Sequence, residues 1–247
     1  MSLVVRNLKR LLAVMFVVSL ATGIAEIAAG SVPRARAQKD NGAGTVLTPD
    51  KGKFRIVLDG QAVGNEEFEI SASGGTWMAR GSTSAHVPGV TDITASGELK
   101  LSADGTPIHY DWSAQAQKKA TGAVDFANGT AKCSANLGGT SPMMKDFKFD
   151  SPRVAVLDNN LYYQYALLAQ IYDWKAGGNQ TFPVVIPQDL TPGSISVQSI
   201  GLQQIENKSY ETLRVSTTDL EILLYLDATH HMVRLEVPSS KVSIERE

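Results

Sequence analysis

The sequence predicts a mostly β (α+β) protein in which a curved antiparallel sheet, or an incomplete β-barrel, wraps around one helix. Three observations lead to this fold class. Apolar and polar residues alternate with a period of two along most of the chain after position 53, turn residues separate the alternating runs, and one segment has helical spacing instead. Strands do not alternate with helices, and this favours an antiparallel arrangement over a parallel α/β fold.

Residues 1–37 are predicted to be a signal peptide. Basic residues precede a 14-residue apolar run, Leu11–Ile24, and a small-x-small site follows at Ala35–Ala37. A secretory signal core has about 7–15 apolar residues, whereas a spanning helix needs about 20. We therefore expect cleavage after Ala37 and a periplasmic or secreted protein that does not span the membrane. The alternative is an uncleaved anchor from Leu11 to Ala29.

The composition excludes several classes of protein. The full chain has 23 basic and 25 acidic residues, and removal of the signal leaves 210 residues with a formal charge of −6. This acidic balance argues against a nucleic-acid partner. The single cysteine, Cys133, rules out an internal disulfide or a Cys-rich zinc site, and its apolar neighbours indicate a buried thiol. No cofactor is expected.

A single domain is predicted over residues 53–247. Residues 38–52 lack periodicity and are expected to form a flexible leader. About 12 strands are then predicted, two of them about 11 residues long, with Asp59-Gly60, Asp104-Gly105 and Asn128-Gly129 as turns. Their signals fall at 53–58, 67–70, 92–102, 108–116, 124–126, 131–137, 182–186, 195–197, 213–215, 220–226, 233–237 and 242–244.

One helix is predicted at about residues 159–175. Its apolar stripe consists of Leu161, Tyr165, Leu168 and Tyr172. Asp158, Asn159 or Asn160 could cap its start, and Gly177-Gly178 could end it.

Small residues on the inward strand faces, such as Ala95, Gly97, Ala114 and Ala131, leave volume inside the predicted sheet. Protein interiors pack densely, so either the helix fills this volume as a plug or part of it remains as an apolar pocket. The aromatic and apolar residues expected to line such a pocket are Tyr110, Trp112, Tyr165, Leu168 and Tyr172.

Two segments resemble exported bacterial families. They are Phe54-x-Ile56-x-x-x-Gly60-x-x-Val63-Gly64-x-Glu66 and Tyr225-Leu226-Asp227-x-x-His230-x-Met232-Val233-Arg234-Leu235-Glu236-Val237-Pro238. With the predicted architecture, the chain resembles the periplasmic lipoprotein carriers LolA and LolB and the uncharacterised exported families similar to them. The resemblance implies a lipid or another hydrophobic molecule as the ligand, and it transfers no particular binding residue.

Catalytic and metal-binding motifs are not found. The adjacent histidines His230 and His231 are poorly spaced for a metal, and His109 with Asp111 lies on a polar strand face without an assignable nucleophile. Glu66, Glu67 and Glu69 are expected on an exposed face. No Gly-x-Ser-x-Gly elbow or phosphate-binding loop occurs. We therefore do not expect an enzyme.

The favoured function is binding of an apolar ligand in the concave face. The alternatives are a non-catalytic structural or protein-interaction module of the envelope, whose partner would be an envelope protein, and a secreted hydrolase assembled only in the fold. An outer-membrane barrel is a further alternative, because such barrels also alternate over about ten residues. The internal helix and the Arg246-Glu247 terminus argue against it.

Overall fold

The computed structural model describes residues 47–139, 141–217 and 220–247, and most of these belong to a single 15-stranded sheet. The elements, in chain order, are β1 (Asp50–Leu58), β2 (Gln61–Ser73), β3 (Thr76–Ala85), β4 (Ile93–Leu101), β5 (Pro107–Gln115), β6 (Lys119–Ala127), β7 (Thr130–Asn136), β8 (Met143–Lys148), β9 (Ala155–Val156), α2 (Tyr163–Ile171), β10 (Asn179–Ile186), β11 (Thr191–Ile205), β12 (Lys208–Ser216), β13 (Glu221–Leu226), β14 (Met232–Val237), η1 (Pro238–Ser240) and β15 (Val242–Arg246).

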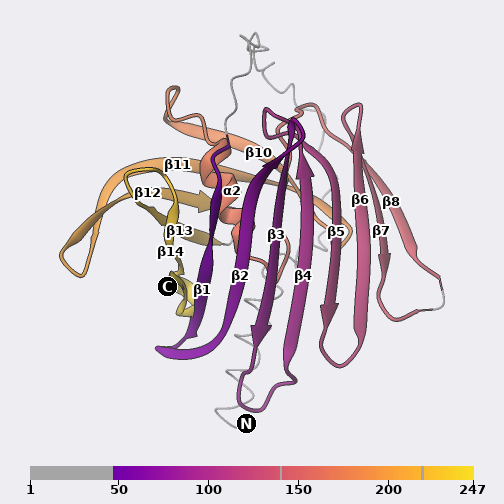
Figure 1. The fold of residues 1–247 in the computed structure, drawn as a ribbon, viewed down its shortest axis with the longest axis horizontal. Helices are drawn as coiled ribbons and strands as arrows, with labels where there is room; N and C mark the ends of the chain where they lie inside the picture. The colour runs from indigo at the N-terminus through magenta and orange to yellow at the C-terminus, as the bar shows by residue number, and fades with distance from the viewer. Residues whose placement is uncertain (1–46, 140, 218–219) are drawn as a thin grey trace, which may run out of the picture.

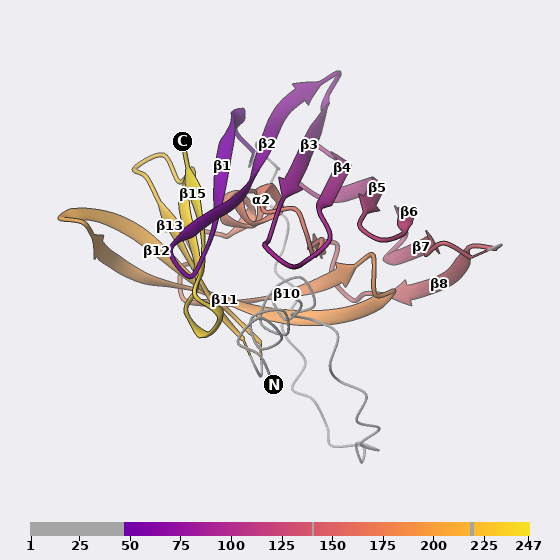
Figure 2. The same cartoon turned by 90° about the horizontal axis from the view of Figure 1, so that it is seen from below.

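The sheet is built from two meanders. The first consists of β1–β8 and the second of β9–β15, and the first and last strands join them. Strand β1 pairs with β15, so the order runs β8-β7-β6-β5-β4-β3-β2-β1-β15-β14-β13-β12-β11-β10-β9. Neighbouring strands are antiparallel, except that β9 pairs with β10 in parallel. Figure 2 shows β1–β8 on one side of α2 and β10–β11 on the other, so the sheet curls around the helix. The prediction of a mostly β, curved sheet is confirmed.

Three strands were missing from the sequence prediction: β3, β8 and β9. The inward residues of β3 include Ala79, Gly81 and Thr83, which contrast weakly in hydropathy with their outward neighbours. Strand β8 has one buried residue and β9 has two residues, so neither shows a period. The two strands predicted at about 11 residues, β4 and β5, have nine each.

The predicted turns are present at the hairpin tips. Asn128 and Gly129 connect β6 to β7 with φ values of 50° and 71°, and Asp59 and Gly60 connect β1 to β2 with φ values of 52° and 80°. Two successive residues with positive φ give the twist that a tight hairpin needs. Asn-Gly and Asp-Gly tolerate this conformation best, because glycine lacks a Cβ and the short polar side chains suit it.

The first described strand begins earlier than Lys53. Strand β1 starts at Asp50, and Leu47 is already buried. The Asp50 side chain is only 2% exposed and forms an ion pair with Arg246 at 2.5 Å, which ties the start of β1 to the end of β15. The predicted flexible leader is therefore too long at its C-terminal end. Its residues 38–46 and the predicted signal peptide lie outside the described residues.

Helix α2 spans Tyr163–Ile171 and is shorter than the predicted 159–175. No side chain of Asp158, Asn159 or Asn160 caps it, and the cap residue is Tyr162. The helix ends at Ile171 because Tyr172 is extended, six residues before Gly178. Within the described residues, no helix is long and apolar enough to cross a membrane.

The segment around the helix fills space left by inward glycines. A Cβ on Gly81 would lie 2.4 Å from the Tyr163 ring, and one on Gly97 would lie 2.4 Å from the Tyr110 hydroxyl and 2.7 Å from Leu161. The glycines therefore admit these larger side chains to the sheet surface. The segment around the helix therefore fills this part of the interior. This agrees with the first of the two expected alternatives, in which the helix acts as a plug. Figure 1 shows α2 behind the strands of the first meander.

Candidate functional site

An apolar cavity lies between the start of α2 and the second meander. Its volume is about 90 Å³. The apolar side chains in its wall are Leu157, Tyr162, Tyr165, Val184, Ile186, Ile195, Val215, Leu220, Ile222, Leu235 and Val237. They come from the segment before α2, from α2 itself, and from β10 to β14 and the β12–β13 connection. This enclosure by one helix and several strands is typical of sites for apolar ligands.

Asp158 is the charged residue in this wall, and it is buried. It is 6% exposed, and its Oδ2 accepts hydrogen bonds from the Tyr110 hydroxyl, at 2.8 Å, and from the Gln188 amide. Its Oδ1 accepts the backbone N–H of Asn160 at 2.9 Å. Burial raises the pKa of Asp158, although these hydrogen bonds pull it down in part. No lysine, arginine or histidine is among the cavity-lining residues in the described chain.

A second buried carboxyl, Glu66 of β2, holds the start of the helix. It is fully buried, and it accepts the backbone N–H groups of Tyr162 at 2.6 Å and Tyr163 at 2.8 Å. The Thr83 hydroxyl donates to it at 3.2 Å. The first N–H groups of a helix have no partner within the helix, so Glu66 replaces the missing side-chain cap. The helix thereby receives its cap from a strand about 100 positions earlier.

The charge of Glu66 is disfavoured where it lies. Burial raises its pKa to about 8, and the nearby charge of Asp158 acts in the same direction. The three hydrogen bonds oppose this rise without cancelling it. A buried pair of carboxyls with raised pKa values beside an apolar cavity is a common mark of a functional site.

The expectation that Glu66 lies on an exposed face is wrong. Side chains of a strand alternate between faces, and Glu66 has the same parity as Phe68 and Ile70, which are buried. The signal was present in the sequence, because an acidic residue in phase with two apolar ones points inward. Glu67 is exposed, and Glu69 pairs with Arg80 at 2.5 Å, as outward residues do.

Tyr162 lines a second apolar hollow as well as the cavity. This hollow has a volume of about 20 Å³ and lies toward β1–β4. Its other lining residues are Ile56, Leu58, Val63, Thr83, Ala85, Val87, Ile93, Asn160 and Val242. Because Tyr162 belongs to both walls, a change in its side-chain position would alter both spaces. Its peptide N–H is held by Glu66, so the acidic network also positions this residue.

The residues predicted from the sequence fall into three places. Tyr165 lines the apolar cavity. Tyr110, Leu168 and Tyr172 are packed in the core, where the Tyr172 hydroxyl donates to the Gly178 carbonyl at 2.6 Å. Trp112 is also buried, packs over Gly122 and borders a hollow on the outer face. Their role in ligand binding stays a prediction.

Sequence reasoning missed most of the cavity wall. Ile195, Ile222 and Val237 were recognised only as strand residues, and Asp158 was considered only as a helix cap. Nothing in a single strand indicates which other strand it faces across the interior. The cavity could therefore be found only in the folded chain.

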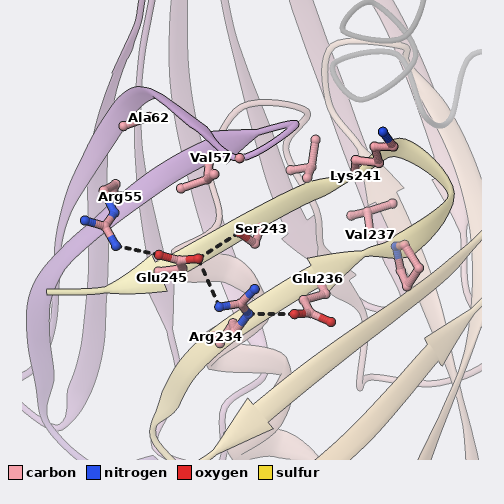
Figure 3. A pocket seen from close by; sticks show the side chains of 12 residues that line it. Arg55, Val57, Ala62, Arg234, Glu236, Val237, Lys241, Ser243 and Glu245 are labelled. Atoms are coloured by element: carbon pink, nitrogen blue, oxygen red, sulfur yellow. Dashed lines mark hydrogen bonds and ion pairs between the residues drawn. The ribbon is translucent and has the colours of Figure 1, made fainter. Parts of the chain in front are cut away.

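Two further hollows lie on the outer surface. One, of about 550 Å³, lies over β1, β14 and β15, and Figure 3 shows Glu245 between Arg55 and Arg234. The distances from Glu245 are 2.6 Å to Arg55 and 3.0 Å to Arg234, which also contacts Glu236 at 2.7 Å. Partial burial would raise the pKa of Glu245, but the hydrogen bonds and charges of these partners lower it on balance. A ligand would have to compete with these ion pairs.

The other outer hollow, of about 830 Å³, covers β2–β7, and its lining includes Glu67, Arg80 and Asp111. Beside it, His109 lies between Asp125 at 2.6 Å and Asp111 at 2.9 Å. Burial would lower the pKa of His109, but the two aspartates raise it overall. Within the described residues, the hydrogen bonds of His109 join it to these two aspartates and not to a nucleophile. The described residues also contain no group of three His, Cys, Asp or Glu side chains suited to a metal ion.

The sequence matches no protein-family model and no curated protein. Several solved structures are similar to this chain, including the following two. One is a β-barrel-like protein of the domain of unknown function DUF1849 from Brucella abortus, with 10% identity, a TM-score of 0.52, and coverage of 81% of this chain and 94% of that one. The fold of the present chain is therefore barrel-like. The other is a DUF1089 family protein from Pseudomonas aeruginosa, with 9% identity, a TM-score of 0.42, and coverage of 81% and 96%. At such identities the first comparison supports the fold and nothing further.

Proposed function

We propose that this protein is an exported, non-catalytic, barrel-like protein that binds an apolar or lipid-like ligand between α2 and the second meander. The observation that supports it most directly is the apolar cavity walled by Tyr162, Tyr165 and the strands β10 to β14. The signal-peptide pattern supports export, and the resemblance to periplasmic lipoprotein carriers supports a lipid-like ligand.

The cavity volume bears on the ligand. Typical small-molecule sites measure about 300–1,000 Å³, whereas this cavity has about 90 Å³ and the neighbouring hollow about 20 Å³. Even together the two spaces stay below this range, so a complete acyl chain would need both spaces and the volume that the Tyr162 side chain now occupies. Tyr162 lines both, so we propose that its displacement connects them when a ligand enters.

Gly193 of β11 offers a direct test of this function. It lines the cavity, pairs with Val184, and a Cβ built on it meets no atom of the described residues within 4 Å. Gly193→Leu should fill part of the cavity without a clash in the core. Gly139→Leu, in the loop after β7, is the matched control, because within the described residues a Cβ there meets Ser141 alone, at 3.8 Å.

The experiment is solvent extraction and mass spectrometry of the protein purified from the periplasm, together with titration by a fluorescent apolar reporter. Wild type and Gly139→Leu should carry lipid and bind the reporter, and Gly193→Leu should bind at least ten-fold more weakly. Absence of lipid and of reporter binding in the wild type would contradict the function. An N-terminus other than Gln38 would contradict the predicted cleavage site, and recovery with the cytoplasm would contradict the proposed export.

A second candidate function is protein interaction, and one observation favours it. Strand β8 ends the sheet order and has Met143 and Met144 exposed at 47% and 68%. An open strand edge can add an extended strand of another protein. Site-specific crosslinking from position 144 in cells should then recover one defined envelope protein, whereas a lipid-binding role does not require such a product.

A further inference from the structure

The polar surroundings of the cavity indicate which chemical class of ligand would fit, and this inference rests on the proposed function. Asp158 is the only charged residue among those that line the cavity or the neighbouring hollow in the described chain. The second acidic group, Glu66, contacts the backbone of Tyr162 from behind the wall. A ligand in this place therefore meets buried carboxyl groups and no cationic side chain in the wall.

Asp158 has one hydrogen-bond position still open. Its two oxygens offer about four acceptor positions, and hydrogen bonds from the described residues use three: two on Oδ2, from Tyr110 and Gln188, and one on Oδ1, from Asn160. The remaining position on Oδ1 can accept one more donor.

Gln188 holds this carboxyl from outside the cavity wall. Its amide nitrogen donates to Asp158, while its Oε1 is buried and has no hydrogen-bond partner among the described residues. Gln188 does not line the cavity, and neither do Tyr163 and Gln164, which carry unpartnered donors. Asp158 is therefore the acceptor in the cavity wall on which the choice of ligand depends.

We infer that the ligand is an apolar chain ending in a hydrogen-bond donor, such as an alcohol or an amine, and that free fatty acids are excluded. A hydroxyl or ammonium group can donate to Oδ1 of Asp158. A carboxylate has no hydrogen to donate to Asp158, and no cationic side chain in the cavity wall would balance its charge in a place shielded from water. Burial of an unpaired charge is unfavourable because little solvent surrounds it.

The test compares three probes of equal chain length: decanol, decylamine and decanoate. Each displaces the fluorescent apolar reporter from the mature protein, residues 38–247, at pH 8. We expect decanol and decylamine to displace it at concentrations at least ten-fold lower than decanoate. Asp158→Asn should reduce this preference to less than three-fold, and Asp150→Asn, an exposed site with the same chemical change, should leave it intact.

The outcomes separate this inference from the proposed function. If the reporter does not bind, the proposed function itself fails. If the reporter binds and all three probes displace it equally, or decanoate does so best, the apolar site stands and the head-group inference is overturned. If Asp158→Asn keeps the full preference, Asp158 is not its cause. If this variant does not fold, the wild-type ranking of the three probes still decides the inference.

Discussion

Replacement of Glu66 by glutamine should change how stability depends on pH. Burial raises the pKa of this carboxyl from an ordinary 4.5 to about 8. A carboxyl whose pKa is higher in the folded state contributes stability that is complete below about pH 4.5 and is lost as the pH rises through 8. A rise of roughly 3.5 pKa units corresponds to about 5 kcal/mol at most.

The variant also loses a hydrogen bond, and the cost of this loss does not depend on pH. Glu66 accepts from Tyr163 on one oxygen and from Tyr162 and Thr83 on the other. A glutamine amide keeps one oxygen and replaces the other with a donor, so one buried N–H is left unpaired at a cost of about 1–3 kcal/mol. This cost is present at every pH.

The assay is urea unfolding followed by tryptophan fluorescence between pH 5 and 9. Glu66→Gln should be about 1–3 kcal/mol less stable than wild type at pH 5, and the difference should shrink or reverse toward pH 9. Glu67→Gln, the exposed neighbour, should follow the wild type throughout. A difference between Glu66→Gln and wild type that stays constant from pH 5 to 9 would refute the reasoning.

Three further predictions concern packing and pairing. Gly97→Ala should lower the free energy of unfolding by about 1–3 kcal/mol, measured in urea, because its Cβ would lie 2.4 Å from the Tyr110 hydroxyl. Burial raises the pKa of Cys133 to about 11, so a thiol reagent at pH 8 should modify it only at the rate of unfolding; rapid labelling of the native protein would contradict this. Arg246→Met should cost about 3–5 kcal/mol, because it leaves the Asp50 carboxylate, 2% exposed, without its partner. The double variant with Asp50→Asn should recover part of that loss in the same unfolding assay.

The strands and turns of this protein were largely predictable. Alternation is a property of a few consecutive residues, so 93–101 and 107–115 were recognisable as strands without knowledge of their neighbours. Turn dipeptides such as Asn128-Gly129 act locally in the same way. Prediction failed where inward and outward residues differ little in hydropathy, as in β3, whose inward face includes alanine, glycine and threonine.

The candidate site was less predictable, because its groups come from distant segments. Glu66 and Tyr162 are 96 positions apart, and their hydrogen bond fixes where α2 begins. The parity of Glu66 with Phe68 could have placed it inside, but no pattern names the helix N–H groups as its partners. Tyr165 lies in the cavity wall, whereas most of its neighbours there come from β10 to β14.

The sequence by itself determined the mostly β class, the turns and the inward-facing side chains, and it supplied the expectation of export. Each of these depends on a short stretch of chain. Only the tertiary structure decided that β1 pairs with β15, that a buried glutamate caps the helix, and that an apolar cavity lies beside Asp158. These features depend on contacts between residues far apart in the chain, and the burial that raises the pKa of Glu66 exists only once those contacts have formed.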